Sequence, residues 1–101
     1  MVLLAIGWVP DIFNLNIEKI GLKYGEWNEI IVDENHMTNI ENIFAIGDCI
    51  DKVNLTPVAI RAGRIVGEYL YGNKNLKMDY EDVPTVIFSH PPTIHIGLNE
   101  N

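Results

Sequence analysis

The chain has 101 residues with fourteen acidic and seven basic side chains, which is enough for a globular protein of modest size. Its net charge of −7 argues against nucleic acid and anionic membrane surfaces as partners, because both repel a negatively charged protein. Cys49 is the only cysteine, which excludes an internal disulfide, a cysteine-pair metal site and a redox-active dithiol built from this chain alone.

The first segment of the chain is apolar. Val2–Ile6 form a continuous apolar run before Gly7, which predicts a strand covered on both faces. The run has no basic leader and is too short to cross a bilayer. We therefore expect no targeting signal, no membrane anchor and a cytoplasmic location. Downstream, Asn14–Ile20 predict one short helical turn that Gly21 ends.

The middle of the chain predicts further extended segments. Residues 22–24 and 29–32 are separated by a spacer of four residues, which indicates a hairpin. Ile43–Ile46 form a second continuous apolar run, which predicts a buried strand ending at Gly47 and Asp48. Beside it, Cys49 is expected to be a small buried apolar group.

The strongest helix signal follows a short loop. Thr56 as N-cap and Pro57 at the first helical position predict a helix to about Tyr71, closed by Gly72. Small residues recur every four positions along one face of it: Ala59, Gly63 and Gly67. Because glycine within a helix costs about 1 kcal/mol relative to alanine, we expect a neighbouring backbone or ligand to pack closely there.

The last part of the chain begins with a polar stretch, Asn73–Asp82, which reads as a linker. The sequence "VPTVIF" then predicts a strand, and Thr93–Ile96 predict another after two prolines. Apolar runs without visible partners at both ends suggest two incomplete domains, residues 1–72 and 73–101, joined near residues 73–82.

Four motifs carry a family resemblance: "VLLAIGWVPD", "NIENIFAIGDCIDKVNLTPVAIRAGR", "DYEDVPTVIFSHPP" and "IGLNEN". In this order they resemble the FAD-dependent pyridine nucleotide-disulfide oxidoreductases along nearly the whole chain. The resemblance implies an α/β fold with two dinucleotide-binding domains. This chain would supply the end of the NAD(P)H domain, the return segment of the FAD domain and the start of an α+β interface domain, through which these enzymes form homodimers.

Two shorter motifs narrow the choice of branch within the family. "LTP" at Leu55–Pro57 is similar to the glutathione, trypanothione and large thioredoxin reductases, and "FSHPP" at Phe88–Pro92 then favours the glutathione reductases, which would make glutathione disulfide the substrate and NADPH the reductant. Trypanothione and thioredoxin reductases remain alternatives within enzymes. A non-catalytic scaffold that associates with complementary chains is an alternative of a different class.

The resemblance assigns an FAD site to two neighbouring segments. Asp48, after Gly47, would hold the ribityl chain of FAD, because a carboxylate at the end of a strand can accept hydrogen bonds from sugar hydroxyls. The helix start at Leu55, Thr56 and Pro57 would face the flavin, where the positive end of the helix dipole favours negative charge. An ordinary turn aspartate and an ordinary capped helix are the alternatives.

Further residues match substrate and nucleotide positions of the family. Arg64 would contact glutathione, although a plain surface arginine is the alternative. Gly7, Asn54 and Val86 fall where the family places contacts on the nicotinamide side of NADPH, and Asn54 stands where an apolar residue is usual.

Several features depart from the family or are missing. Trp8 replaces a usual arginine, and "PPTIHIGL" replaces a typical "PPIGTVGL". His90 is expected to be structural, since the family's proton-transferring histidine lies in a later segment, and the sequence indicates no metal site. No GxGxxG occurs among the eight glycines and no dithiol is present, so we expect this chain alone to be inactive.

Overall fold

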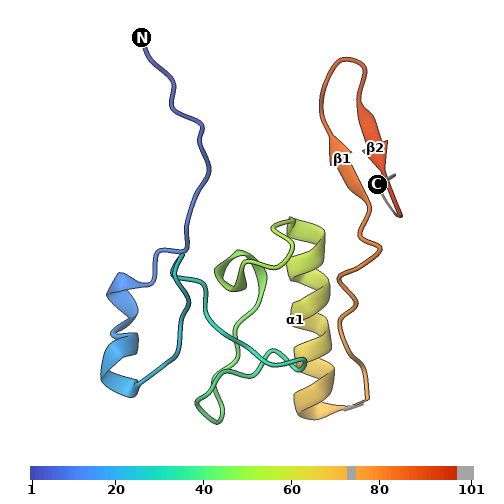
Figure 1. The fold of residues 1–101 in the computed structure, drawn as a ribbon. Helices are drawn as coiled ribbons and strands as arrows, with labels where there is room; N and C mark the ends of the chain where they lie inside the picture. The colour runs from blue at the N-terminus through green and yellow to red at the C-terminus, as the bar shows by residue number, and fades with distance from the viewer. Residues whose placement is uncertain (73–74, 98–101) are drawn as a thin grey trace.

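The computed structural model describes residues 1–72 and 75–97. Three short 3-10 helices, one α-helix and two strands follow one another in Figure 1: η1 (Phe13–Leu15), η2 (Ile17–Ile20), η3 (Gly47–Ile50), α1 (Thr56–Tyr71), β1 (Thr85–Ile87) and β2 (Thr93–His95). The first two residues of the predicted linker and the end of the "IGLNEN" motif lie outside the described residues. The Cα radius of gyration is 16.2 Å, against about 13 Å for a compact chain of this length, so the fold is open.

The prediction of a buried strand at the N-terminus is wrong. Val2–Ile6 have no regular secondary structure, and their side chains are exposed, with Leu3 at 84%. Figure 1 shows this segment extending away from the rest of the chain. A strand covered on both faces needs neighbouring strands to bond its backbone and layers to cover its side chains, and none of the described residues lies alongside.

A small apolar core lies within residues 12–50. The predicted helical turn is confirmed as η1 and η2, and Gly21 ends η2 in the left-handed region (φ 69°), with its N–H donating to the Glu18 carbonyl oxygen at 3.1 Å. The buried apolar side chains of the core form one cluster: Ile12, Ile17, Leu22, Ile30, Ala45 and Ile50. Ile50 belongs both to this cluster and to η3, so the core holds η3 in place.

The two predictions of strand pairing in this region are only partly right. The predicted hairpin contains a single antiparallel bridge, between Tyr24 and Ile30. The predicted strand Ile43–Ile46 is wrong, because its only bridge joins Phe44 to Met37. Backbone hydrogen bonds flank each bridge, such as the one from the Ala45 N–H to the His36 carbonyl oxygen at 3.0 Å, but the pairing does not continue into the successive bridges that define a strand.

Helix α1 ends at the predicted residue, Tyr71, and begins one residue earlier than predicted. Leu55 is the N-cap, with extended φ and ψ of −131° and 133°, so Thr56 lies inside the helix and the prediction of Thr56 as the cap is wrong. Pro57 still lies in the first turn, where its missing N–H is not needed. Gly72 ends the helix, its N–H donating to the Glu68 carbonyl oxygen at 2.8 Å.

Two of the three small residues on this face of α1, Ala59 and Gly63, lie against a neighbouring segment. A Cβ on Gly63 would lie 3.1 Å from Ile46 Cδ1, and a Cβ on Gly47 would lie 3.2 Å from Ala59 Cβ. The start of α1 is therefore in close contact with the segment that leads into η3. A Cβ on Gly67 would meet no atom within 4 Å.

We expect Gly67→Ala to raise the free energy of unfolding of this chain by about 1 kcal/mol, because alanine is favoured in helices and the site has room for its methyl group. Urea unfolding followed by circular dichroism measures the change. Gly63→Ala is the matched variant, and its gain should be smaller because the new methyl group displaces Ile46. A Gly67→Ala protein no more stable than the parent contradicts the expectation.

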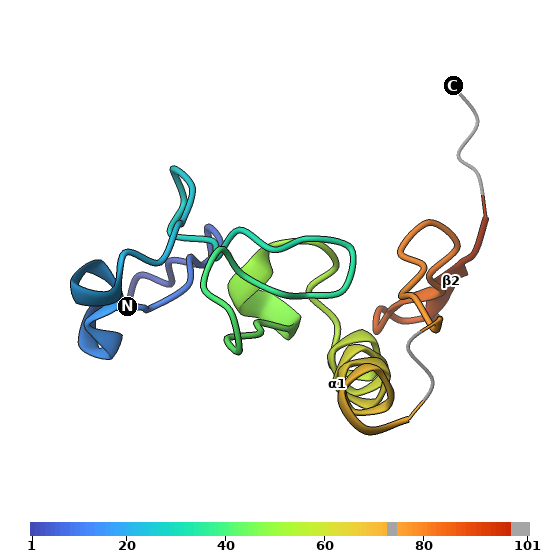
Figure 2. The same cartoon turned by 90° about the horizontal axis from the view of Figure 1, so that it is seen from below.

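The C-terminal strands pair with each other. β1 and β2 form an antiparallel hairpin in which Thr85 lies opposite His95 and Val86 opposite Ile94. The expectation that these strands lack partners in the chain is therefore wrong. Figure 1 shows the preceding segment, residues 75–84, returning alongside α1, with the β1–β2 hairpin beyond the end of the helix. In Figure 2, which looks along α1, the hairpin lies to one side of the helix.

Candidate functional site

The candidate site lies where η3 meets the first turns of α1. Gly47 opens η3 with φ 74°, a left-handed conformation that L residues adopt at a cost of about 1–2 kcal/mol. Its missing side chain allows it to lie against Ala59. Asp48 comes next, in the first turn of η3, and is exposed.

Contacts with the core fix η3 in place. The Ile30 N–H donates to the Cys49 carbonyl oxygen at 2.7 Å, and Ile50 is buried at the other end of the turn. Cys49 itself is half-buried, and its thiol donates to the Ile46 carbonyl oxygen at 3.2 Å. Cys49 packs against the apolar core as predicted, but it is only partly buried. Asp48 is consequently held on a turn whose backbone has defined partners.

The start of α1 presents a helix end without a side-chain cap. Leu55 makes no side-chain capping bond, Pro57 has no N–H, and the first helical bond is from the Ala59 N–H to the Leu55 carbonyl oxygen at 3.0 Å. Thr56 and Pro57 are exposed. The positive end of the helix dipole therefore points to a surface that an electron-rich group can reach.

Asp48 lines a cavity of about 200 Å³. The remaining lining residues come from the N-terminal segment, the hairpin turn and the end of η3: Trp8, Val9, Pro10, Trp27 and Asp51. Trp8, the residue that departs from the family, is 68% exposed and shares this cavity with the proposed sugar-binding acid. Asp51 and Trp27 were not identified from the sequence; the three-residue spacing between Asp48 and Asp51 is the one available signal for the second acid.

A second cavity, of about 360 Å³, lies beside the helix start. Pro57, Val58 and Arg61 line it from α1, and the facing wall comes from the segment that returns along the helix: Met78, Asp79, Asp82, Val83 and Pro84. Asp48 and Pro57 therefore line different cavities, although η3 and α1 pack together. Sequence reasoning did not find this second wall, because it depends on the path of the linker.

The remaining predicted site residues are spread over the molecule. Arg64 is exposed on α1, eight residues and roughly 12 Å of helix beyond Thr56. Gly7 lies in the extended N-terminal segment with φ 112°, and Val86 is 41% exposed on β1. Asn54 precedes α1; its Nδ2 donates to Asp51 Oδ1 at 3.0 Å, whereas its Oδ1 is buried without a partner.

Metal and membrane sites receive no support from the part of the chain that the structure describes. No three histidine, cysteine or acidic residues there are grouped closely enough to hold a metal ion. No helix among the described residues has the length and apolarity needed to span a bilayer. His90 is exposed, and its Nδ1 lies 3.2 Å from the Ser89 carbonyl oxygen.

Solved structures match this arrangement along most of the chain. The Cu(II) complex of the HOCl-induced flavoprotein disulfide reductase RclA from Escherichia coli superposes with a TM-score of 0.89 at 30% identity, over 95% of this chain and 22% of that one. Another RclA structure superposes with a TM-score of 0.83 at 29% identity, over 93% of this chain and 22% of that one. The fold is thus an α/β segment of the flavoprotein disulfide reductase fold.

Sequence comparisons agree with the fold. Residues 1–63 match the family described as pyridine nucleotide-disulphide oxidoreductase, and the chain belongs to this family. A glutathione reductase of Schizosaccharomyces pombe is 44% identical over 97 residues, which cover 95% of this chain and 21% of that enzyme. The chain thus spans about a fifth of the length of that relative. The family resemblance found in the sequence is confirmed, and the family implies an oxidoreductase with a flavin cofactor.

Proposed function

We propose that this chain is the flavin-binding return segment of an NADPH-dependent glutathione-disulfide reductase. The observation that carries the proposal is an exposed acid, Asp48, on a turn packed against the uncapped start of α1. In this proposal residues 1–72 end the NAD(P)H domain and complete the FAD domain, and residues 73–101 begin the interface domain of a homodimer. The enzyme would act in the cytoplasm.

The residues present fit the sugar and ring portions of FAD. Asp48 would accept hydrogen bonds from ribityl hydroxyls. Because Gly47 has no side chain, the turn that carries Asp48 can lie close to α1. The helix end at Leu55–Pro57 would stabilise negative charge on the flavin ring. FAD, when bound, supplies the electron transfer between a reduced nicotinamide and a disulfide. The other walls of the flavin site are assigned to the rest of the enzyme.

The substrate and nucleotide contacts are extensions of the same proposal. Arg64 would pair with a carboxylate of glutathione, since a guanidinium on a rigid helix can donate two parallel hydrogen bonds. Gly7, Asn54 and Val86 would contact the nicotinamide side of NADPH. What supports these assignments is the 44% identity to the yeast enzyme along nearly the whole chain.

A chimera provides the test. The matching 97 residues of the S. pombe enzyme are replaced by this chain, and the purified protein is assayed for visible flavin absorbance and for NADPH-dependent reduction of glutathione disulfide. We expect a yellow, active protein, because this segment would restore the acid and the helix end. The isolated chain serves as the reference and should reduce nothing.

Two results would contradict the proposal. A folded dimeric chimera without flavin would remove the cofactor assignment. A flavin-bearing chimera that reduces trypanothione disulfide or thioredoxin in preference to glutathione disulfide would assign the chain to the trypanothione or the thioredoxin reductases.

A further inference from the structure

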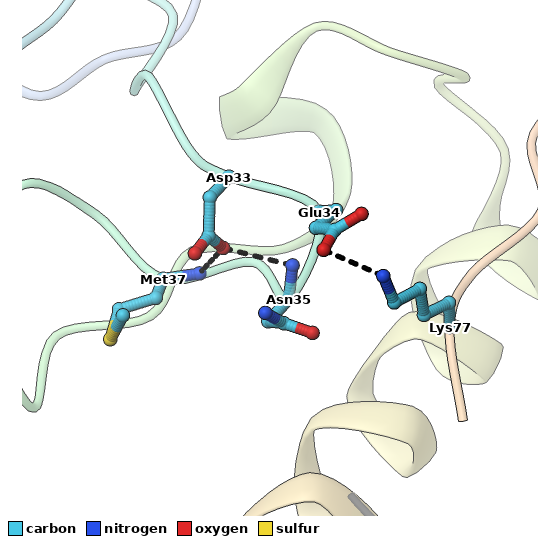
Figure 3. A network of polar contacts seen from close by, with 5 residues as sticks. All are labelled: Asp33, Glu34, Asn35, Met37 and Lys77. Carbon is cyan, nitrogen blue, oxygen red and sulfur yellow. Dashed lines mark hydrogen bonds and ion pairs between the residues drawn. The ribbon is translucent and has the colours of Figure 1, made fainter. Parts of the chain in front are cut away.

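His36 is a buried polar side chain in the 33–37 turn, which contributes no residue to the candidate flavin site. It has an exposed fraction of 1% and lies in the left-handed region at φ 64°. Asp33 fixes this turn, because its carboxylate accepts hydrogen bonds from the N–H groups of Asn35 at 2.8 Å and Met37 at 2.9 Å (Figure 3). The histidine ring is thus held inside by a defined backbone.

The ring of His36 contacts a residue 44 positions later in the chain. Its Nε2 lies 2.5 Å from the Tyr80 hydroxyl oxygen, and the two ring centroids are 5.9 Å apart. Its Nδ1 is buried without a hydrogen-bond partner. Tyr80 belongs to the segment 75–84 that returns along α1, so this hydrogen bond joins that segment to the 33–37 turn.

Two weaker contacts lie beside this hydrogen bond. Lys77 Nζ is 2.6 Å from Glu34 Oε1, as Figure 3 shows, and Lys52 Nζ is 5.1 Å from the Tyr80 ring centroid. Both partners of the ion pair are more than half exposed, and such pairs contribute about 0–1 kcal/mol. The His36–Tyr80 contact is therefore the main buried attachment of the segment to the turn.

The groups around His36 disfavour a positive charge on it. Burial, and then Lys52, lower the pKa of His36 below its ordinary value of 6.5, while Asp33 opposes them in part. Burial also raises the pKa of Tyr80, which therefore stays neutral. If Tyr80 donates to Nε2, a proton on Nε2 removes the acceptor. If Nε2 donates instead, the added proton on Nδ1 has no acceptor.

We propose that the His36–Tyr80 contact is a pH-sensitive attachment that holds residues 75–84 on the 33–37 turn at neutral pH and releases them on acidification. The released segment carries Met78, Asp79 and Asp82, which wall the 360 Å³ cavity beside the start of α1. Acidification thus opens this cavity. The device does not depend on flavin binding.

The direction of the pH dependence follows from the lowered pKa. The released segment leaves His36 in water, where it binds a proton more readily than when it is buried. The attachment is at full strength above about pH 6.5 and weakens as the pH falls below that value. Each unit by which the pKa is lowered corresponds to about a tenfold weaker attachment at low pH.

Hydrogen exchange of the 101-residue chain, corrected for the intrinsic effect of pH, tests the proposal. Protection of residues 75–84 should fall between roughly pH 7.5 and pH 5.5, by up to about tenfold. In His36→Gln, which keeps polar atoms but does not titrate, protection should not change over this range. The exposed residues His90 and His95 provide the controls, and His90→Gln and His95→Gln should respond as the parent does.

Further measurements keep the test decisive if His36→Gln does not fold. Tyr80→Phe keeps the ring and loses the hydroxyl, so residues 75–84 should already be poorly protected near neutral pH and should lose no more on acidification. In the parent protein, nuclear magnetic resonance should give His36 a pKa below its ordinary value of 6.5, with the amide shifts of residues 75–84 following His36. Constant protection in the parent, an unchanged response in His36→Gln, or amide shifts of residues 75–84 that do not follow His36 would each overturn the proposal.

Discussion

Gly47→Val is expected to destabilise the chain by about 2–5 kcal/mol, the sum of roughly 1–2 kcal/mol for a left-handed L residue and roughly 1–3 kcal/mol for overpacking. The position has φ 74°, and even a bare Cβ there lies 3.2 Å from Ala59 Cβ. That atom is attached directly to the backbone of α1, so it cannot move aside without moving the helix. Urea unfolding followed by circular dichroism measures the loss, because α1 is the longest helix in the described residues.

Gly21→Val separates the two contributions. Gly21 has φ 69°, nearly the same conformation, but a Cβ there meets no atom within 4 Å. This variant should show the backbone cost without the overpacking, and so should lose less stability than Gly47→Val. If Gly47→Val is unfolded even without urea, the stabilities of Gly47→Ala and Gly21→Ala can be compared instead. Equal losses at the two positions would mean that η3 does not depend on its approach to α1.

In the chimera with the yeast enzyme, Asp48→Asn is expected to weaken FAD binding about 10- to 100-fold. Hydrogen bonds to a charged group are each worth about 1.5–3 kcal/mol, and the amide is neutral and has one acceptor oxygen where the carboxylate has two. Asp48 is exposed on a turn fixed by the core, so the substitution removes charge and acceptors and leaves the fold intact. Titration of the flavin-free protein with FAD, followed by flavin fluorescence, gives the two dissociation constants.

Asp51→Asn is the matched control for that measurement. Asp51 lines the same cavity and carries the same charge, and its φ of 46° is one that asparagine tolerates. FAD affinity should change little in this variant. An equal effect of the two substitutions would indicate that the overall negative charge of the cavity matters, and that Asp48 has no specific contact with the flavin.

The α-helix was predictable from the sequence because its signals are local. Pro57 in the first turn and Gly72 after the last residue bound α1 at the observed positions. The cap was assigned one residue too late because Thr56 is a good N-cap residue type, whereas the backbone leaves the extended region at Leu55. Side-chain preference and backbone path disagree there, and the backbone decides.

The strands were less predictable because pairing depends on distant backbone. Val2–Ile6 and Ile43–Ile46 have the composition of buried strands, but the first pairs with no described strand and the second pairs with residues 36–38 through one isolated bridge only. The strand predictions for "VPTVIF" and Thr93–Ile96 are confirmed, because these segments are close in sequence and pair with each other as β1 and β2. Composition identifies a segment that can form a strand, and topology decides whether it does.

The candidate site was predictable in one part. The Gly47–Asp48 step and the helix start were found from motif resemblance, and the structure packs η3 against α1. Their roles toward FAD, NADPH and glutathione remain proposals. The His36–Tyr80 contact was not predictable, since nothing local to either residue indicates a partner 44 positions away.

The exposed N-terminal run has a practical consequence for work with the isolated chain. Val2, Leu3, Leu4 and Ile6 are all more than three-quarters exposed, and the backbone beside them pairs with no described strand. An extended apolar segment with free amide and carbonyl groups is a template for edge-to-edge pairing between molecules, and it contains no charged or proline residue that would block such pairing. Concentrated preparations should therefore aggregate through this segment first, and Leu4→Lys should reduce that aggregation.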